Sequence, residues 1–153
     1  MAKVGPDVEI LEFAVAREVE AYHFFMVLAG RVTNLGTRRA FEDFAKEELE
    51  HKAKLELEIM KMGKTVVVVE EEAPKSKEDY MVTADGPPLD MDYKDMLKLG
   101  MEKEEASFRT YVNLLANVDS EESREVLLAI AEEEVKHKLR FQLEYDMLLK
   151  KEG

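Results

Sequence analysis

Two Glu-x-x-His pairs, each preceded by a lone glutamate thirty residues earlier, are the residues of this sequence best suited to chemistry. The six residues are Glu18, Glu48, His51, Glu104, Glu134 and His137. Side chains three apart on a helix lie on one face, so the Glu and His of each pair can bind the same metal ion. Four carboxylates and two imidazoles predict a site for two metal ions. This ligand set suits iron or manganese, and zinc is possible.

Helical periodicity shows which glutamates point inward. Apolar or small residues surround Glu18 three, four and seven positions away, among them Leu11, Ala21 and Phe25. The same holds for Glu48, Glu104 and Glu134, so each of four helices is expected to aim one glutamate at the protein interior. Four buried carboxylates would repel one another or take up protons. Two divalent cations would neutralise them.

The second half of the sequence repeats the first at an offset of 86 residues, without a gap. The offset places Glu18, Glu48 and His51 on Glu104, Glu134 and His137. It also aligns core positions, for example Phe41 with Leu127 and Phe25 with Tyr111. A repeat that preserves both the apolar core and the polar residues inside it indicates that the polar residues have a function.

Four segments have the periodicity of long helices. We expect them at about Asp7 to Thr33, from Thr37 as N-cap to Met62 with Gly63 as the stop, from Asp90 as N-cap to about Asn117, and from Asp119 and Ser120 almost to the C-terminus. Asp119 and Glu122 have the spacing of a capping box.

The segment between the second and third helices, about 63–89, is long for a loop and contains the β-branched run Val66–Val69, which favours a strand. Such a connection is expected where a helical hairpin must cross over to a second hairpin. The predicted fold is therefore an all-α, ferritin-like four-helix bundle, a single domain over residues 1–153.

Composition excludes several classes of protein. Hydrophobic residues make up 46% of the chain, which indicates a globular domain, and the net charge of −12 argues against nucleic-acid binding. The absence of cysteine excludes disulfides, thiol catalysis and a rubredoxin-type iron centre within this chain. With neither an apolar membrane span nor a leader peptide in the sequence, we expect a cytoplasmic protein with no membrane partner.

Chance could also produce Glu-x-x-His in a sequence this acidic. Glu20 and His23 form a third pair, but a two-residue step turns the helix by about 200°, so they should point away from the Glu18 face. Tyr22 and Tyr111 lie near the predicted site. Each is interpreted either as an aromatic residue of the core or as a hydrogen-bond partner of a ligand residue. A metal-free interaction bundle is the alternative to the metal site as a whole.

The segments Glu18–Phe25, Glu47–His51, Glu104–Tyr111 and Glu133–His137 resemble the ferritin-like di-iron carboxylate superfamily, in its rubrerythrin-like branch. The resemblance covers all four helices. It implies a di-iron site built from the six residues, with Glu48 and Glu134 bridging the metals. It also implies an oxidoreductase that reduces hydrogen peroxide or oxygen.

The chain departs from rubrerythrins in two ways. It lacks the rubredoxin domain, so electrons would come from an external donor such as a separate rubredoxin-like protein. Ser107 replaces a glutamate one turn after the third-helix ligand. An iron-binding protein with slow ferroxidase activity is therefore the second hypothesis. We expect a homodimer.

Overall fold

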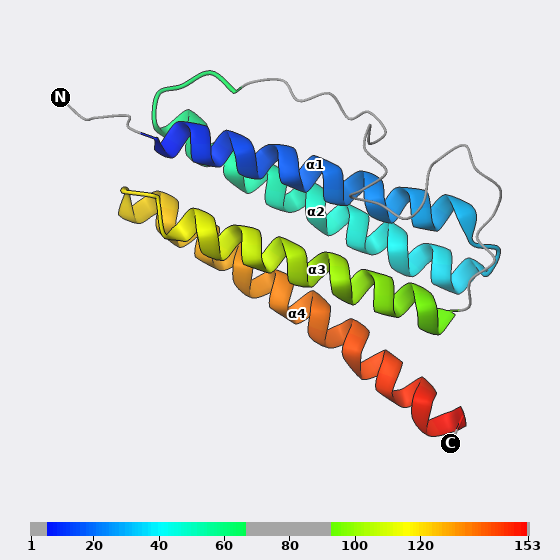
Figure 1. Cartoon of the computed structure of the whole chain (residues 1–153). Helices are drawn as coiled ribbons and strands as arrows, with labels where there is room; N and C mark the ends of the chain where they lie inside the picture. The colour runs from blue at the N-terminus through cyan, green and yellow to red at the C-terminus, as the bar shows by residue number, and fades with distance from the viewer. Residues whose placement is uncertain (1–5, 67–92, 153) are drawn as a thin grey trace. The chain divides into compact units, whose positions relative to one another are not determined.

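The computed structural model describes residues 6–66 and 93–152, and all regular structure in these ranges is helical. The four helices are α1 (Asp7–Arg31), α2 (Leu35–Lys61), α3 (Tyr93–Leu115) and α4 (Glu121–Glu152), as Figure 1 shows. The predicted all-α class, with four long helices, is confirmed. None of the helices described is both long enough and apolar enough to cross a membrane.

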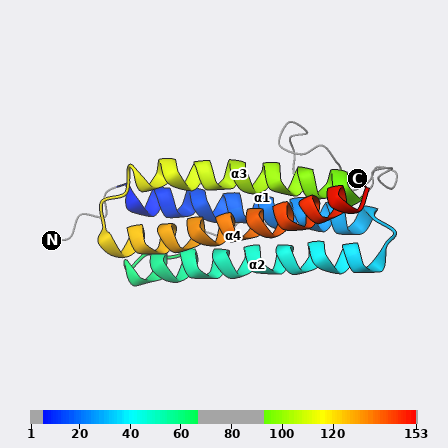
Figure 2. The ribbon, with the colours of Figure 1, turned by 90° about the horizontal axis from the view of Figure 1, so that it is seen from below.

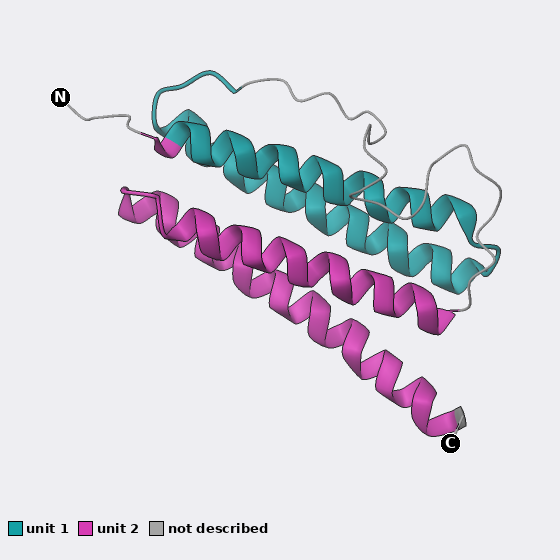
Figure 3. Ribbon diagram, in the orientation of Figure 1, with its two compact units in different colours: residues 1–4, 8–90 teal, residues 5–7, 91–153 magenta. Residues whose placement is uncertain are grey.

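The helices form two hairpins, which belong to two compact units (Figure 3). In the first unit, α1 and α2 lie side by side and run in opposite directions. In the second unit, α3 and α4 also lie side by side and run in opposite directions, as both Figure 1 and Figure 2 show. The predicted pair of helical hairpins is therefore confirmed.

The ends of α2 are fixed by local hydrogen bonds. Asn34, in an extended conformation, is the N-cap, and its Oδ1 accepts a hydrogen bond of 3.0 Å from the backbone N–H of Thr37. The predicted cap, Thr37, is therefore wrong by one turn. At the other end Gly63 has φ of 77° and the backbone N–H of Lys64 donates to the carbonyl of Ile59, a Schellman motif. The predicted stop at Gly63 is confirmed.

The N-terminus of α4 is capped in the same way as that of α2. Ser120 Oγ accepts a hydrogen bond from the backbone N–H of Ser123, and the carbonyl of Ser120 accepts one from Arg124. The cap is therefore Ser120 and not the predicted Asp119. The predicted cap of the third helix, Asp90, lies outside the described residues, as do most of the 63–89 crossover and Val67–Val69. Val66 is described and lies in neither a helix nor a strand.

An arginine closes each hairpin turn, and the two arginines are equivalent in the repeat. Arg38 donates from Nε to the carbonyl of Ala29 at 3.1 Å and from Nη2 to that of Val32 at 3.0 Å. Arg124 donates from Nη1 to the carbonyl of Leu115 and from Nη2 to that of Val118, both at 2.9 Å. These carbonyls lie at or just beyond the end of the preceding helix, where no intrahelical donor is available. The offset of 86 residues thus preserves this bonding pattern as well as the residue types.

The apolar stripes predicted around the four glutamates are buried. Side chains of this kind that are at most 2% exposed include Leu11, Val15, Phe25, Phe41, Leu55, Leu97, Tyr111, Leu127, Ile130 and Phe141. The aromatic rings of the first unit also contact one another, since Phe25 lies 6.2 Å from Phe41 and 5.6 Å from Phe44 between ring centroids. Each hairpin therefore has a buried apolar face, which the polar residues described next interrupt.

Candidate metal centre

The first unit brings together Glu18 from α1 with Glu48 and His51 from α2. All three are buried, at 2%, 0% and 1% exposure. His51 Nδ1 lies 3.1 Å from Glu18 Oε1 and 3.6 Å from Glu48 Oε1. One ligand atom from each residue lies within 4.8 Å of those of the other two, a separation at which one ion can contact all three.

The second unit assembles the same residue types from α3 and α4. Glu104, Glu134 and His137 are 1%, 0% and 3% exposed. His137 Nδ1 lies 3.7 Å from Glu104 Oε2, and again one ligand atom from each residue lies within 4.8 Å of the others. The structure therefore places all six predicted ligand residues in two half-sites of identical composition.

The two half-sites share the orientation of the imidazole. In both units Nδ1 is the ring nitrogen that faces the glutamates. The two half-sites differ in the distance from Nδ1 to the glutamate on the first helix of each hairpin. The His51–Glu18 contact is a hydrogen bond, whereas the His137–Glu104 distance is too long for one. His51 thus lies closer to Glu18 than His137 lies to Glu104.

The chemistry of the donor set fits a pair of divalent cations. Burial of an ionised carboxylate in an apolar environment costs several kcal/mol or more unless the charge is compensated. Each half-site holds two buried carboxylates and one imidazole and no buried lysine or arginine, within the described residues. Oxygen and imidazole ligands in this proportion suit iron, manganese or zinc. A metal ion in each half-site would offset the negative charge of these carboxylates.

Glu20 and His23, the third Glu-x-x-His pair, are outside both half-sites. Glu20 forms an ion pair of 3.1 Å with Arg17 on α1, and its side chain is 32% exposed. His23 is half-buried and packs edge-on against the ring of Tyr22. No metal-ligand group among the described residues contains either residue. Tyr22 is half-buried, whereas Tyr111 is 1% exposed in the core of its unit.

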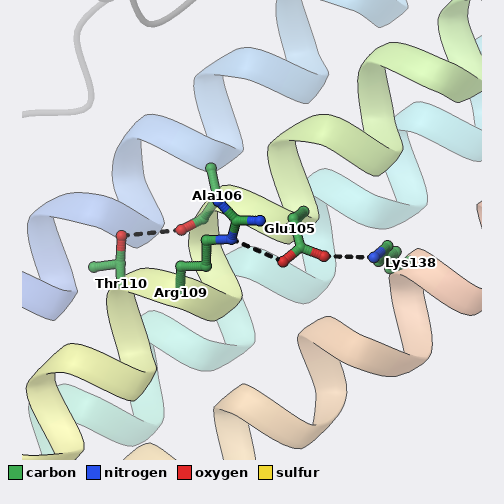
Figure 4. Close-up of polar contacts among 5 residues, drawn as sticks. All are labelled: Glu105, Ala106, Arg109, Thr110 and Lys138. Carbon is green, nitrogen blue, oxygen red and sulfur yellow. Dashed lines mark hydrogen bonds and ion pairs between the residues drawn. The ribbon is translucent and has the colours of Figure 1, made fainter.

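An ion-pair bridge between α3 and α4 is a feature that sequence reasoning missed. Glu105 accepts a hydrogen bond from Lys138 Nζ and one of 3.0 Å from Arg109 Nε, as Figure 4 shows. These two hydrogen bonds lower the pKa of Glu105, chiefly the one from Lys138. Glu105 follows Glu104 and Lys138 follows His137, so the bridge joins the two helical turns that carry the second half-site.

The repeat places no carboxylate at the first-unit position that corresponds to Glu105. The positions that match Glu105 and Lys138 are Val19 and Lys52, and Lys52 pairs with Glu56 at 3.4 Å on its own helix. A groove of about 570 Å³ lies beside the bridge, lined by Lys98, Met101, Glu102, Glu105, Ala106, Arg109, Lys138 and Gln142. Only the Glu105–Arg109 spacing of four residues was visible in the sequence. The cross-helix partner could be identified only from the helix packing.

Comparisons with known proteins agree with the site. The rubrerythrin family model matches residues 9–145, which include all six candidate ligands. A solved structure of a hypothetical protein from Pyrococcus furiosus is 26% identical, with a TM-score of 0.69 over 94% of this chain and 90% of that one. A search of curated proteins finds no match. Because the family model covers nearly the whole chain, the predicted ferritin-like four-helix class is confirmed, and the chain belongs to the rubrerythrin family.

Proposed function

We propose that the two half-sites together hold two iron ions, and that the protein is a di-iron oxidoreductase which reduces hydrogen peroxide or oxygen. The observation that carries the proposal is the presence of two buried half-sites of identical composition in a rubrerythrin-family chain. In this proposal Glu18 and Glu104 would each hold one ion, His51 and His137 would bind through Nδ1, and Glu48 and Glu134 would serve both ions, as the family resemblance implies.

Charge balance supports two ions. Four ionised carboxylates carry four negative charges, which two divalent cations cancel. Without the cations, these carboxylates would have to take up protons to remain buried. The equal donor content of the two half-sites favours one ion for each.

Peroxide reduction requires two electrons and two protons for each molecule: H₂O₂ + 2e⁻ + 2H⁺ gives two molecules of water. When bound, two iron ions supply the two electrons, one each. The role of the chain is to hold the two ions through its ligand residues and to exclude bulk water. Phe25, Leu55 and Phe141, all at most 2% exposed, provide the apolar surroundings.

The sequence contains no cysteine for an iron–sulfur centre. We propose an external, rubredoxin-like donor. A second candidate function is iron binding with slow oxidation. Ser107 favours this second function. It is half-buried on α3 one turn after Glu104, at the position where the rubrerythrins that the chain resembles carry a further glutamate.

Anaerobic stopped-flow measurements separate the two functions. Protein loaded with two Fe(II) is mixed with one equivalent of hydrogen peroxide, and then with an excess of peroxide and a reductant. Rapid oxidation followed by repeated turnover is expected for the oxidoreductase. One slow oxidation with retention of ferric iron would instead support iron binding alone.

The metal requirement has a separate readout in thermal unfolding. A ligand that binds only the folded state raises apparent stability, so the iron-loaded protein should melt at a higher temperature than the metal-free protein at neutral pH. Equal melting temperatures, together with less than one bound metal ion for each chain, would contradict the di-iron proposal. Glu20→Ala is the control, because it removes a glutamate of α1 that lies outside both half-sites.

A further inference from the structure

The ion-pair bridge of the second unit joins α3 to α4 at the level of the second half-site. Glu105 follows Glu104 by one residue, a rise of about 1.5 Å along the helix, and Lys138 follows His137 in the same way. Glu104 and His137 are buried, whereas the side chains of Glu105 and Lys138 are 33% and 40% exposed. The two helices thus meet twice at this level, through the ligand pair on the buried side and through the bridge on the outer side.

Both carboxylate oxygens of Glu105 take part in the bridge. Arg109 Nε, one turn further along α3, donates to Oε2 at 3.0 Å, and Lys138 Nζ donates to Oε1 from α4 (Figure 4). The contact with Arg109 orients the carboxylate on its own helix. Glu105 is therefore held in the position in which its second oxygen can bond across to the facing helix.

The repeat places the carboxylate partner of the lysine on a different helix in each unit. In the first unit Lys52 pairs with Glu56, four residues later on α2, and the residue that matches Glu105 is Val19. In the second unit Gln142 takes the place of Glu56, and the carboxylate is Glu105 on α3. The second unit thus has an ion pair between its helices where the first has one within a helix.

This difference accompanies the difference between the two ligand pairs. In the first half-site, His51 Nδ1 is hydrogen-bonded to Glu18 at 3.1 Å. In the second, His137 Nδ1 lies 3.7 Å from Glu104, too far for a hydrogen bond. The bridge between the helices therefore occurs in the unit whose histidine and first glutamate are farther apart.

We propose that Glu105 and Lys138 are positioning residues of the second half-site, which hold Glu104 and His137 at a separation at which both bind one ion. This inference rests on the two-ion function proposed above. Contacts outside the ligand set orient the ligands of metal sites and tune metal affinity. A partly exposed ion pair contributes little to overall stability, so the effect of this bridge is confined to the two helical turns that it joins.

The sign of the change in metal affinity separates positioning from simple electrostatics. Lys138→Met removes a positive charge and Glu105→Gln removes a negative one, so electrostatics alone would strengthen cation binding in the first variant and weaken it in the second. Positioning predicts that both variants weaken the binding of one of the two ions by about threefold to tenfold, somewhat less than the effect of residues that bond directly to a ligand. Calorimetric titration of the full chain with Co(II) measures this. Tighter or unchanged binding by Lys138→Met would overturn the proposal.

Lys136→Met is the matched control. Lys136 is the other lysine next to His137 in the sequence, and it is exposed on α4. Its replacement removes the same charge without touching the bridge, so it should not weaken Co(II) binding. Weakening equal to that of Lys138→Met would contradict a specific role for the bridge.

A further variant keeps the charge and changes only its location. Glu105→Val/Gln142→Glu reproduces the residues of the first unit, with a carboxylate four residues after Lys138 on α4 and no change in net charge. It should weaken the same ion as Lys138→Met does, because the lysine is still paired but no longer joins the two helices. Wild-type affinity in this double variant would show that the contact between the helices is not needed.

Hydrogen exchange of the metal-free protein tests positioning independently of the di-iron function. Backbone amides in the turns that carry Glu104 and His137 should exchange at least about twofold faster in Lys138→Met than in the wild type or in Lys136→Met. Equal exchange rates would overturn the proposal, whatever metal the protein binds. Faster exchange in a protein that binds fewer than two Co(II) ions would support the positioning role and contradict the two-ion function instead.

Discussion

Phe141 on α4 packs its ring against the backbone of Gly100 on α3, so closely that a Cβ on Gly100 would lie 2.8 Å from Phe141 Cζ. The repeat pairs these two positions with Ala14 and Leu55 in the first unit, both of which are buried. A larger residue on one helix thus accompanies a smaller one on the other. The two units therefore fill the same pair of core positions differently, with Gly and Phe in one unit and Ala and Leu in the other.

Gly100→Ala is therefore expected to lower the free energy of unfolding by about 1–3 kcal/mol, through overpacking against Phe141. The double variant Gly100→Ala/Phe141→Leu reproduces the residues of the first unit and should recover part of this loss. Urea unfolding followed by circular dichroism measures both. If the second substitution adds to the loss caused by the first, the two positions are not coupled.

Glu48→Ala and Glu134→Ala are each expected to abolish stoichiometric binding of two metal ions, because each removes the glutamate that we propose as a bridge. Metal analysis of protein loaded with Fe(II) measures the stoichiometry. Glu20→Ala and His23→Ala are the controls and should retain two ions. Loss of metal in these controls, together with full binding by Glu48→Ala, would show that the α1 ligand was assigned to the wrong face of the helix.

Arg38→Ala and Arg124→Ala are each expected to lower the free energy of unfolding by about 1–2 kcal/mol, because each leaves two helix-end carbonyls without a charged donor. Lysine cannot reproduce the two-pronged contact, so Arg→Lys should recover little. Thermal or urea unfolding measures the change. Arg39→Ala is the matched control, since Arg39 is an exposed neighbour of Arg38. An equal loss in that control would mean that surface charge, and not the turn contact, is responsible.

Tyr93 makes the stability of the second unit dependent on alkaline pH. Its pKa is raised by burial, then by its hydrogen bond to Glu144 and by the charge of that carboxylate. A raised pKa in the folded state means that the contribution of Tyr93 to stability is present below its unfolded pKa of about 10 and is lost as the pH rises above it. Melting temperature measured between pH 8 and 11 should fall less steeply for Tyr93→Phe than for the wild type. Tyr145→Phe controls for the loss of a hydroxyl from the same pair of helices, and an equal effect there would contradict the assignment.

Ser107→Glu places a carboxylate one turn beyond Glu104 on the same side of α3. We expect it to raise the rate of peroxide-driven oxidation of the reduced protein, because the added anionic ligand stabilises the oxidised metal. Stopped-flow absorbance compares the two proteins, with Ser107→Gln as a neutral control of the same size. A wild type that already reacts as fast as Ser107→Glu would show that the missing glutamate does not limit the reaction.

Much of the candidate site could be predicted because burial and periodicity reinforce each other there. Glu48 and His51 are polar residues inside an apolar stripe, and the repeat at Glu134 and His137 separates them from a chance pair such as Glu20 and His23. The helix caps were less predictable. Asn34, Thr37 and Ser120 all have side chains that can cap, and the choice depends on backbone conformation, which the sequence pattern does not specify.

Contacts between helices were the other gap. The hydrogen bonds from Arg38 to Ala29 and from Lys138 to Glu105 join residues on different helices. Periodicity describes each helix alone and gives the direction of a side chain, but not its partner. The exposed apolar side chains on α4 were missed for a related reason. Leu139, Leu143 and Met147 interrupt a polar face, and their exposure became clear only once the buried face had been located.

The turn held by Arg38 has a consequence for the tolerance of this protein to insertions. Surface loops usually accept an added residue, since nothing downstream depends on their length. Consider one residue inserted between Val32 and Asn34, with the sequences of α1 and α2 unchanged. The loop could absorb it only if the Arg38 contacts were released or if the added residue became part of α2. The second outcome would turn Glu48 and His51 by about 100° away from Glu18. The length of this short loop therefore sets the alignment of the first half-site, and changes in length at this turn should be far less tolerated than substitutions.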